Sequence, residues 1–304
     1  MLSPVVVGVD GSAESLAAAA WAAREAERRE RPLRLVHAWE GHPRPGEREI
    51  AHAARRHLAL RALRQARDRV RAECPRLRPV DEQTEGPAVP VLLKAAGEAD
   101  VTVLGSRGLS GFTGFLVGSV ALGVVARATC PVVLVRADEE AADEHLPAGD
   151  GGASTETGYR DVVLAVDVHD VRDEVVEYAF EAARLRGARL RAVHAWQAAG
   201  LVGAGPGPGP GGIGPVQDAW QGEEWLDLLQ AALRMWRDKY PDVDVLSTVV
   251  EDRPTTALVR ASTGASLLVV GHRLAERPLG PRTGPVTHAA IHHVTCPVAV
   301  VPHL

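Results

Sequence analysis

Four residues with a regular spacing follow an apolar run at 101–104: Gly105, Gly108, Gly118 and Ser119. Glycine allows left-handed backbone conformations and lets the main chain approach a ligand closely. Ser119 stands where a helical pattern begins, so its hydroxyl can cap that helix, and the N–H groups and dipole at a helix N-terminus favour an anion. The spacing therefore indicates a loop that cradles phosphate groups.

The elements that position this loop alternate along the first half of the chain. Strands are expected at 5–9, 33–38, 77–83, 101–104 and 132–135, and helices at 12–29, 47–73, 89–98 and 119–128. Strands that alternate with helices pair in parallel through right-handed crossovers. This predicts an α/β fold with a doubly wound five-stranded parallel sheet. Ligands bind such sheets at the carboxyl ends of the strands, which is where the glycine loop begins.

The sequence also repeats itself. The segment "LVHAW" at 35–39 returns as "AVHAW" at 192–196, an offset of 157 residues. Farther along, "ATCPVVLV" at 128–135 returns as "VTCPVAVV" at 294–301, an offset of 166 residues. The difference indicates an insertion in the second half, most simply within the Pro-Gly stretch at 203–215. A repeat of this length indicates a duplicated domain rather than a solenoid.

We therefore expect two tandem domains, at 1–137 and 159–304, joined by residues 138–158. The joining segment is acidic and then Gly-rich, which is typical of a linker. Each copy ends in an apolar strand, at 132–135 or 298–301, that would otherwise be an exposed edge. Paired edges avoid aggregation, so we expect the two copies to pack as a pseudo-two-fold pair. A homodimer of whole chains is left open.

Composition excludes several classes of protein. The 304 residues are 46% hydrophobic and 24% charged, with a net charge of −5, as in an ordinary globular protein. Arginines alternate with glutamates along helical stretches such as 24–31, which predicts solvated helix surface and no nucleic-acid partner. The longest uncharged run, 108–126, contains several glycines and is interpreted as a loop and a buried helix, so no membrane partner is expected.

Cysteine usage indicates the compartment. Cys74, Cys130 and Cys296 are far apart, odd in number and form no C-x-x-C pair, which argues against a disulfide framework and favours a reducing cytoplasm. The N-terminus runs straight into an expected strand and shows no signal-peptide pattern. We therefore expect a cytoplasmic protein.

With these motifs in place, the chain resembles the universal stress protein family in its nucleotide-binding branch. The signature of that branch is glycine, two residues, glycine, nine residues, glycine and then serine or threonine, which Gly105, Gly108, Gly118 and Ser119 match. The resemblance covers both halves, including "VGVDGS" at the first strand and "TCPVVLV" at the last. It implies tandem Rossmann-like domains of the adenine nucleotide alpha hydrolase type.

The resemblance further implies an adenine nucleotide site in the first domain, with ATP as the ligand and Mg or Mn accompanying its phosphates. It assigns the nucleoside pocket to Val9, Asp10 and Val36. The ribose and the inner phosphate are assigned to Gly105, Ser106 and Gly108. The outer phosphates are assigned to Gly118, Ser119 and Val120. An aspartate at a strand end can accept from a ribose hydroxyl or hold a divalent ion, and the main chain of Val36 can contact an adenine edge. Alternatively, Asp10 only caps the following helix, a role that it can combine with binding.

The counterpart loop in the second half, "GHRLAERPLGPRTGP" at 271–285, departs from this signature. Leu274 replaces the middle glycine and disfavours a left-handed turn. Pro285 replaces the serine and removes both a hydroxyl and a backbone N–H. Asp167 still stands at the strand end, and arginines in the loop can attract an anion. We expect the nucleotide to bind the first domain and not the second.

Other patterns are interpreted as structural. A formal G-x-G-x-x-G at Gly207, Gly209 and Gly212 lies in a Pro-Gly alternation that cannot open a helix, so it indicates a low-complexity insertion. Three histidines and a cysteine near the C-terminus have a spacing that would suit a zinc site. Two of the histidines are adjacent and point in different directions on a helix, so we interpret these residues as helix surface and the start of a strand rather than as zinc ligands. These four residues are His288, His292, His293 and Cys296.

Three functions remain at this stage. The first is a non-enzymatic ATP-binding switch that regulates or buffers a process under stress; the others are a slow ATP hydrolase and an interaction protein whose sites are structural. The sequence lacks G-x-S-x-G, H-E-x-x-H and a P-loop G-K-S/T. No base for a hydrolytic water stands out at 105–119, which favours the switch over the hydrolase.

Overall fold

The computed structural model describes residues 2–39, 49–106, 117–197, 215–274 and 284–304. The elements of the first domain are β1 (Val5–Gly8), α1 (Ala13–Arg28), β2 (Leu33–Trp39), α2 (Glu49–Glu73), β3 (Val80–Glu85), α3 (Ala88–Ala96), β4 (Val101–Gly105), α4 (Ser119–Val125) and β5 (Val132–Val135). They follow the expected order. Strand β3 begins later than expected, because Leu77 lies in the turn after α2, where its N–H donates to the Cys74 carbonyl at 3.1 Å.

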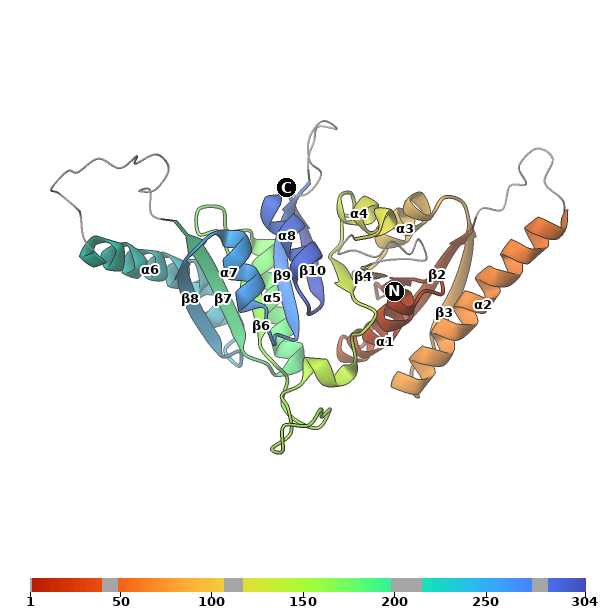
Figure 1. The fold of residues 1–304 in the computed structure, drawn as a ribbon, viewed down its shortest axis with the longest axis horizontal. Helices are drawn as coiled ribbons and strands as arrows, with labels where there is room; N and C mark the ends of the chain where they lie inside the picture. The colour runs from red at the N-terminus through yellow and green to blue at the C-terminus, as the bar shows by residue number, and fades with distance from the viewer. Residues whose placement is uncertain (1, 40–48, 107–116, 198–214, 275–283) are drawn as a thin grey trace, which may run out of the picture.

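The same order recurs in the second domain, after a short 3-10 helix, η1 (Ala141–Glu144), in the linker. Its elements are β6 (Val162–Ala165), α5 (Asp173–Arg186), β7 (Leu190–Trp196), α6 (Pro215–Lys239), β8 (Val245–Glu251), α7 (Pro254–Ala261), β9 (Leu267–Arg273), α8 (Pro285–His293) and β10 (Val298–His303). The two domains lie side by side, with the linker crossing below them in Figure 1. In the described part of the chain, no helix combines the length and apolar character that a membrane span requires.

All ten strands form one sheet, in the order β3-β2-β1-β4-β5-β10-β9-β6-β7-β8. Within each domain neighbouring strands are parallel, and the order reverses direction between β1 and β4 and between β6 and β9. The two domains meet where β5 pairs antiparallel with β10, with Val133 opposite Ala299. The expected pairing of the two apolar last strands is therefore confirmed.

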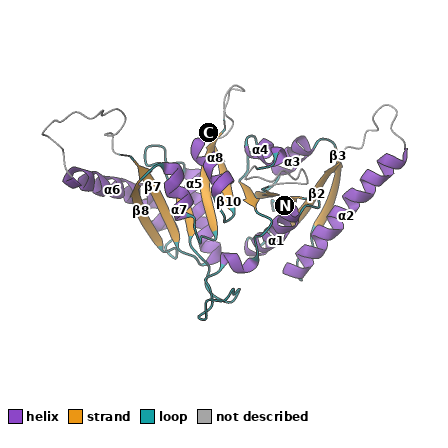
Figure 2. Ribbon diagram, viewed as in Figure 1, coloured by secondary structure: helices purple, strands orange, loops and turns teal. Residues whose placement is uncertain are grey.

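Helices cover both faces of the sheet (Figure 2). The strand residues alternate between the faces: Val5 and Val7 pack in the core under α1, α2, α5 and α6, whereas Val6 packs in the core under α3, α4, α7 and α8. This period of two, with apolar residues on both faces, is what a parallel sheet covered by helices requires. The fold is thus the doubly wound α/β architecture that the alternating pattern predicts.

Helix α1 fixes the geometry beside the glycine loop. Its N-cap is Ser12, whose hydroxyl accepts the Ser15 N–H at 3.2 Å. Alanines from Ala17 to Ala23 allow the helix to pack closely on the sheet, and Trp21 is completely buried between them. The first turn of α1 therefore lies directly beside the carboxyl ends of β1 and β4.

The linker is more ordered than its composition suggests. Glu144 in η1 is completely buried. Its carboxylate pairs with Arg24 at 2.8 Å and with Arg28, and both of these arginines belong to α1. An acidic residue in the linker thus becomes a buried partner for two arginines of the first domain.

Candidate functional site

A cavity of about 320 Å³ opens at the carboxyl ends of β1, β2 and β4 in the first domain. Its lining residues come from these strand ends and from the starts of α1, α3 and α4; they are Gly8, Val9, Asp10, Ser15, Val36, Ala38, Ala88, Leu92, Leu104, Gly105, Gly118, Ser119, Val120 and Ala121. The cavity lies at the point where the strand order reverses, which is the usual ligand position in doubly wound sheets.

Seven of the nine residues expected at the nucleotide site line this one cavity: Val9, Asp10, Val36, Gly105, Gly118, Ser119 and Val120. Gly108 falls outside the described residues. Ser106 is buried and does not line the cavity. Its N–H donates to the Val135 carbonyl at 2.7 Å, and its carbonyl accepts the Gly118 N–H at 2.9 Å. Ser106 therefore ties the two ends of the glycine loop together.

Asp10 has a defined position at the end of β1. Its Oδ1 accepts the Ser12 N–H at 2.9 Å and the Ser12 hydroxyl at 2.6 Å. Because Ser12 itself caps α1, the capping role considered for Asp10 belongs to Ser12, and Asp10 acts by orienting that cap. These contacts fix the orientation of the carboxylate where it lines the cavity.

His37 supports the pocket floor from β2. Its Nδ1 lies 2.7 Å from the Val9 carbonyl oxygen. Burial lowers the pKa of His37, which favours the neutral ring, although the hydrogen bond to Val9 opposes this effect. The Val36 carbonyl accepts the Val9 N–H at 2.9 Å and keeps a second lone pair for contact with a ligand.

Gly105 is required by packing as well as by its place in the cavity. A Cβ atom at this position would lie 2.8 Å from the Glu14 carbonyl carbon and 2.9 Å from the Ser15 nitrogen. Only glycine lets β4 end so close to the first turn of α1. The Ser15 hydroxyl contributes to the same corner, since it accepts the Gly11 N–H at 3.1 Å and donates to the Ser12 carbonyl at 3.0 Å.

Sequence reasoning missed part of the lining. Leu92 and Leu104 supply apolar walls, and Ser15 supplies a hydroxyl. Leu92 could have been found from the apolar face of the helix expected at 89–98, which had to pack against a neighbour. Ser15 carried no signal of its own, because a serine one turn into a helix is common and its position at the cavity depends on how α1 meets β4.

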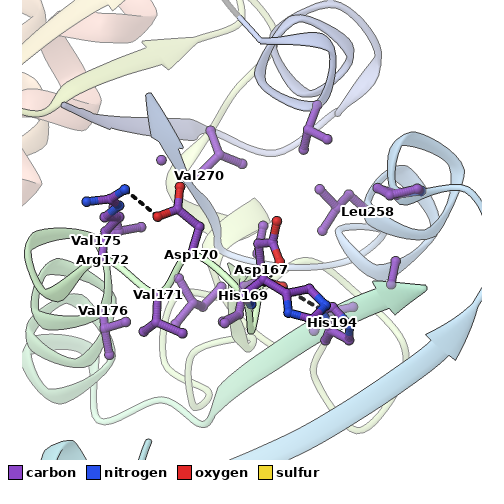
Figure 3. Close-up of a pocket in the computed structure, with 18 of the residues that line it drawn as sticks. Asp167, His169, Asp170, Val171, Arg172, Val175, Val176, His194, Leu258 and Val270 are labelled. Atoms are coloured by element: carbon purple, nitrogen blue, oxygen red, sulfur yellow. Dashed lines mark hydrogen bonds and ion pairs between the residues drawn. The ribbon is translucent and has the colours of Figure 1, made fainter. Parts of the chain in front are cut away.

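The second domain has a larger cavity, of about 530 Å³, at the equivalent strand ends (Figure 3). Asp167 and His194 line it, and His194 Nδ1 lies 3.1 Å from the Val166 carbonyl oxygen, as His37 lies against Val9 in the first domain. The floor of the pocket is therefore repeated in the second domain.

The end of β9, which precedes the counterpart of the glycine loop in the second domain, differs from the end of β4 in the first. Strand β4 ends at Gly105, opposite Val135, whereas β9 continues two residues beyond Gly271, its register bringing Arg273 opposite His303. The Leu274 N–H then donates to the His303 carbonyl at 2.9 Å. Pro285 is the first residue of α8, where it contributes no N–H.

The histidines near the C-terminus form a small cluster. The rings of His288 and His292 lie 4.3 Å apart. Within the described ranges, no group of three or more His, Cys, Asp or Glu side chains is placed to hold a metal ion. Burial raises the pKa of the Cys296 thiol to about 12, which keeps it protonated.

A duplicated doubly wound α/β chain with a ligand-sized cavity at each switch in strand order belongs to the Rossmann-like class of folds. The model of the universal stress protein family matches residues 1–136 and again residues 158–302. The chain therefore belongs to the universal stress protein family.

Similar proteins extend over the whole chain. Universal stress protein Rv2005c of Mycobacterium tuberculosis is 33% identical over 306 residues, which cover 97% of this chain and 96% of that protein. Universal stress protein Rv2623 of the same species is 30% identical over 314 residues, covering 97% and 95%. The crystal structure of a universal stress protein from Archaeoglobus fulgidus superposes with a TM-score of 0.66 at 17% identity, covers 99% of each chain and shows the same fold.

Proposed function

We propose that this chain is a stress-response protein that binds one molecule of ATP, with Mg or Mn on its phosphates, in the cavity of the first domain. The observation that carries the proposal is the convergence of seven residues on one cavity, since the family resemblance assigns each of them to the nucleotide. The resemblance and the cavity are separate lines of support, because the spacing of the glycines says nothing of the distance between β1 and β4.

The chemistry of the cavity suits an adenine nucleotide. Val36, Leu92 and Leu104 provide an apolar surface for a planar base, and Asp10 provides a carboxylate for a ribose hydroxyl or a divalent ion. Gly118 and Ser119, at the start of α4, also line the cavity, and Ser119 is exposed to solvent. The outer phosphates would extend along these two residues.

Binding is favoured over hydrolysis by the side chains available. Asp10 is the one ionisable side chain among the described lining residues, and its Oδ1 already accepts two hydrogen bonds from Ser12. A general base must be free to take a proton from the attacking water. We therefore propose a nucleotide-dependent regulator rather than a hydrolase.

The compartment follows from the thiols. Cys74, Cys130 and Cys296 are buried and unpaired. Free thiols persist in a reducing environment, so we propose that the protein acts in the cytoplasm.

Calorimetry with MgATP on the full chain tests the proposal. We expect one site per chain, which Gly118→Val abolishes because a branched side chain would obstruct the main chain beside the phosphates. Pro285→Ala in the second domain is the matched control and should leave the site unchanged. Two equivalent sites, or a site that survives Gly118→Val in a folded chain, would contradict the assignment. A single-turnover assay with labelled ATP separates a switch from a slow hydrolase.

A further inference from the structure

The cavity of the second domain has an aromatic wall. Trp225 of α6 meets the ring of His169 edge-on, with the ring centroids 5.0 Å apart and the planes at 82°. The ring of His194 lies 5.4 Å from the same indole. All three side chains line the cavity, whereas no aromatic residue is among the described residues that line the first cavity. Such rings favour a flat, aromatic ligand.

A carboxylate lies beside this wall. Asp167, at the end of β6, accepts the His169 N–H through Oδ1 at 3.0 Å, and Figure 3 shows its side chain next to that of His194. It stands at the same strand end as Asp10 in the first domain, where we propose a ribose contact. The half of the pocket that would hold a base and a sugar is therefore present in both domains.

Among the described residues, the half that would hold phosphate differs from that of the first domain. Asp170 pairs with Arg172, and Arg273 from the extension of β9 lies 3.7 Å from its other oxygen. The two guanidinium groups thus share the one carboxylate of Asp170, which partly neutralises them and weakens their attraction for an added phosphate. Pro285 contributes no N–H on the opposite side, where Ser119 has one in the first domain.

We propose that the second cavity binds a planar heteroaromatic ligand with hydroxyl groups and without phosphate, of the nucleoside class. Trp225 and the two histidines hold the ring, Asp167 accepts from the hydroxyl groups, and Asp170 disfavours phosphorylated ligands by neutralising the two arginines beside it. The nucleoside class rests on the proposed function of the first domain, because it is taken from the strand ends that the two cavities share. The chain then has two sites of different selectivity.

The test uses adenosine, AMP and ATP as probes in calorimetry on the full chain carrying Gly118→Val, which obstructs the phosphate positions of the first cavity, and it assigns adenosine binding to the second cavity by its loss in Trp225→Ala. We expect one adenosine site, with AMP and ATP bound at least about tenfold more weakly. The same adenosine titration on the wild-type chain saturated with MgATP keeps the test independent of how the variant folds. Adenosine that fails to bind, or ATP that binds the Gly118→Val chain as tightly as adenosine, would overturn the inference.

Two pairs of variants assign the contacts. Trp225→Ala should weaken adenosine binding about tenfold or more, whereas Leu228→Ala, exposed on the same helix, should leave it unchanged.

Asp170→Asn should raise the affinity for AMP relative to adenosine by about tenfold, since it frees two guanidinium groups for phosphate. Glu174→Gln, exposed at the start of α5, removes the same charge as a control. An unchanged ratio of the two affinities in Asp170→Asn would disprove the role of Asp170.

Failure of this inference is distinguishable from failure of the proposed function. The proposed function fails if the wild-type chain has no ATP site that Gly118→Val removes. The second cavity is judged by adenosine binding and its sensitivity to Trp225→Ala, neither of which requires the first cavity to bind ATP.

Discussion

The carboxylate of Glu25 and the guanidinium of Arg186 lie 2.7 Å apart, and both side chains are completely buried although the two residues belong to different domains. Arg29 also contacts Glu25, at 2.6 Å. Burial raises the pKa of Glu25, but Arg186 and then Arg29 and Arg28 outweigh it and hold the pKa well below its usual range. The ion pair joins α1 of the first domain to α5 of the second, two helices that pack in the same core.

Removing one partner of this pair should be costly. Glu25→Ala leaves Arg186 buried without its main counter-charge, which typically costs about 3–5 kcal/mol. Urea denaturation of the full chain measures the loss. Glu174→Ala, an exposed acidic residue at the start of α5, is the control and should cost less than about 1 kcal/mol. Equal stabilities of the two variants would contradict a structural role for the buried pair.

Glu139 makes the stability of the linker dependent on pH. Burial raises the pKa of its carboxyl to about 8, and the nearby charges of Glu144, Asp143 and Asp138 add to this effect, while Arg24 opposes it. A carboxyl with a raised pKa in the folded state stabilises the fold fully below its unfolded pKa of 4.5, and this contribution is lost as the pH rises through about 8.

We therefore expect Glu139→Gln, which mimics the protonated carboxyl, to match the wild type near pH 5 and to be more stable at pH 8–9. At about 1.4 kcal/mol per pKa unit, the difference should reach a few kcal/mol at most. Thermal unfolding measured across this pH range tests the prediction. Glu156→Gln, at an exposed position of the same linker, should follow the wild-type profile, and parallel profiles for wild type and Glu139→Gln would refute the prediction.

The two domains should stay together when the linker is cut. A protease site inserted in the exposed stretch 149–152 leaves the β5–β10 pairing, the Glu25–Arg186 pair and the contacts of Glu144 intact. Size-exclusion chromatography of the cut protein should give a single complex with the mass of the whole chain. Two separate monomers would show that the interdomain contacts are too weak to hold the pair.

Two glycines should respond in opposite directions to alanine. Gly105→Ala forces a Cβ to within 2.8 Å of the Glu14 main chain, and such overpacking typically costs about 1–3 kcal/mol. Gly222 lies inside α6 with open space around it, so Gly222→Ala should stabilise the chain by up to about 1 kcal/mol. Chemical denaturation compares the two. A harmless Gly105→Ala would mean that β4 can move away from α1.

Local patterns were sufficient to predict most of the fold. Apolar runs with flanking helical periods located the strands, and the exposed-edge argument paired 132–135 with 298–301, as β5 and β10 pair in the structure. In the first cavity the glycine spacing identified residues that do come together, because the Gly118 N–H donates to the Ser106 carbonyl and brings the start of α4 to the end of β4.

Features that depend on distant partners were beyond this reasoning. The linker composition predicted a solvated segment, yet Glu144 is buried because Arg24 and Arg28 meet it from another part of the chain. Trp225 follows the insertion in the second half, so its place beside His194 depends on how α6 packs and not on the repeat. The continuation of β9 to Arg273 likewise depends on its pairing with β10.

The antiparallel seam between β5 and β10 has a consequence for how the two sites change with time. In an assembly of identical subunits every substitution occurs twice, so neither site can diverge alone. Here one gene encodes both halves, and Leu274 and Pro285 alter one site while Gly105 and Ser119 keep the other. The molecule therefore keeps the two-fold arrangement of a dimer, while a substitution in one half leaves the other half unchanged. With the ligands proposed above, it could report on the ratio of two metabolites rather than on the level of one.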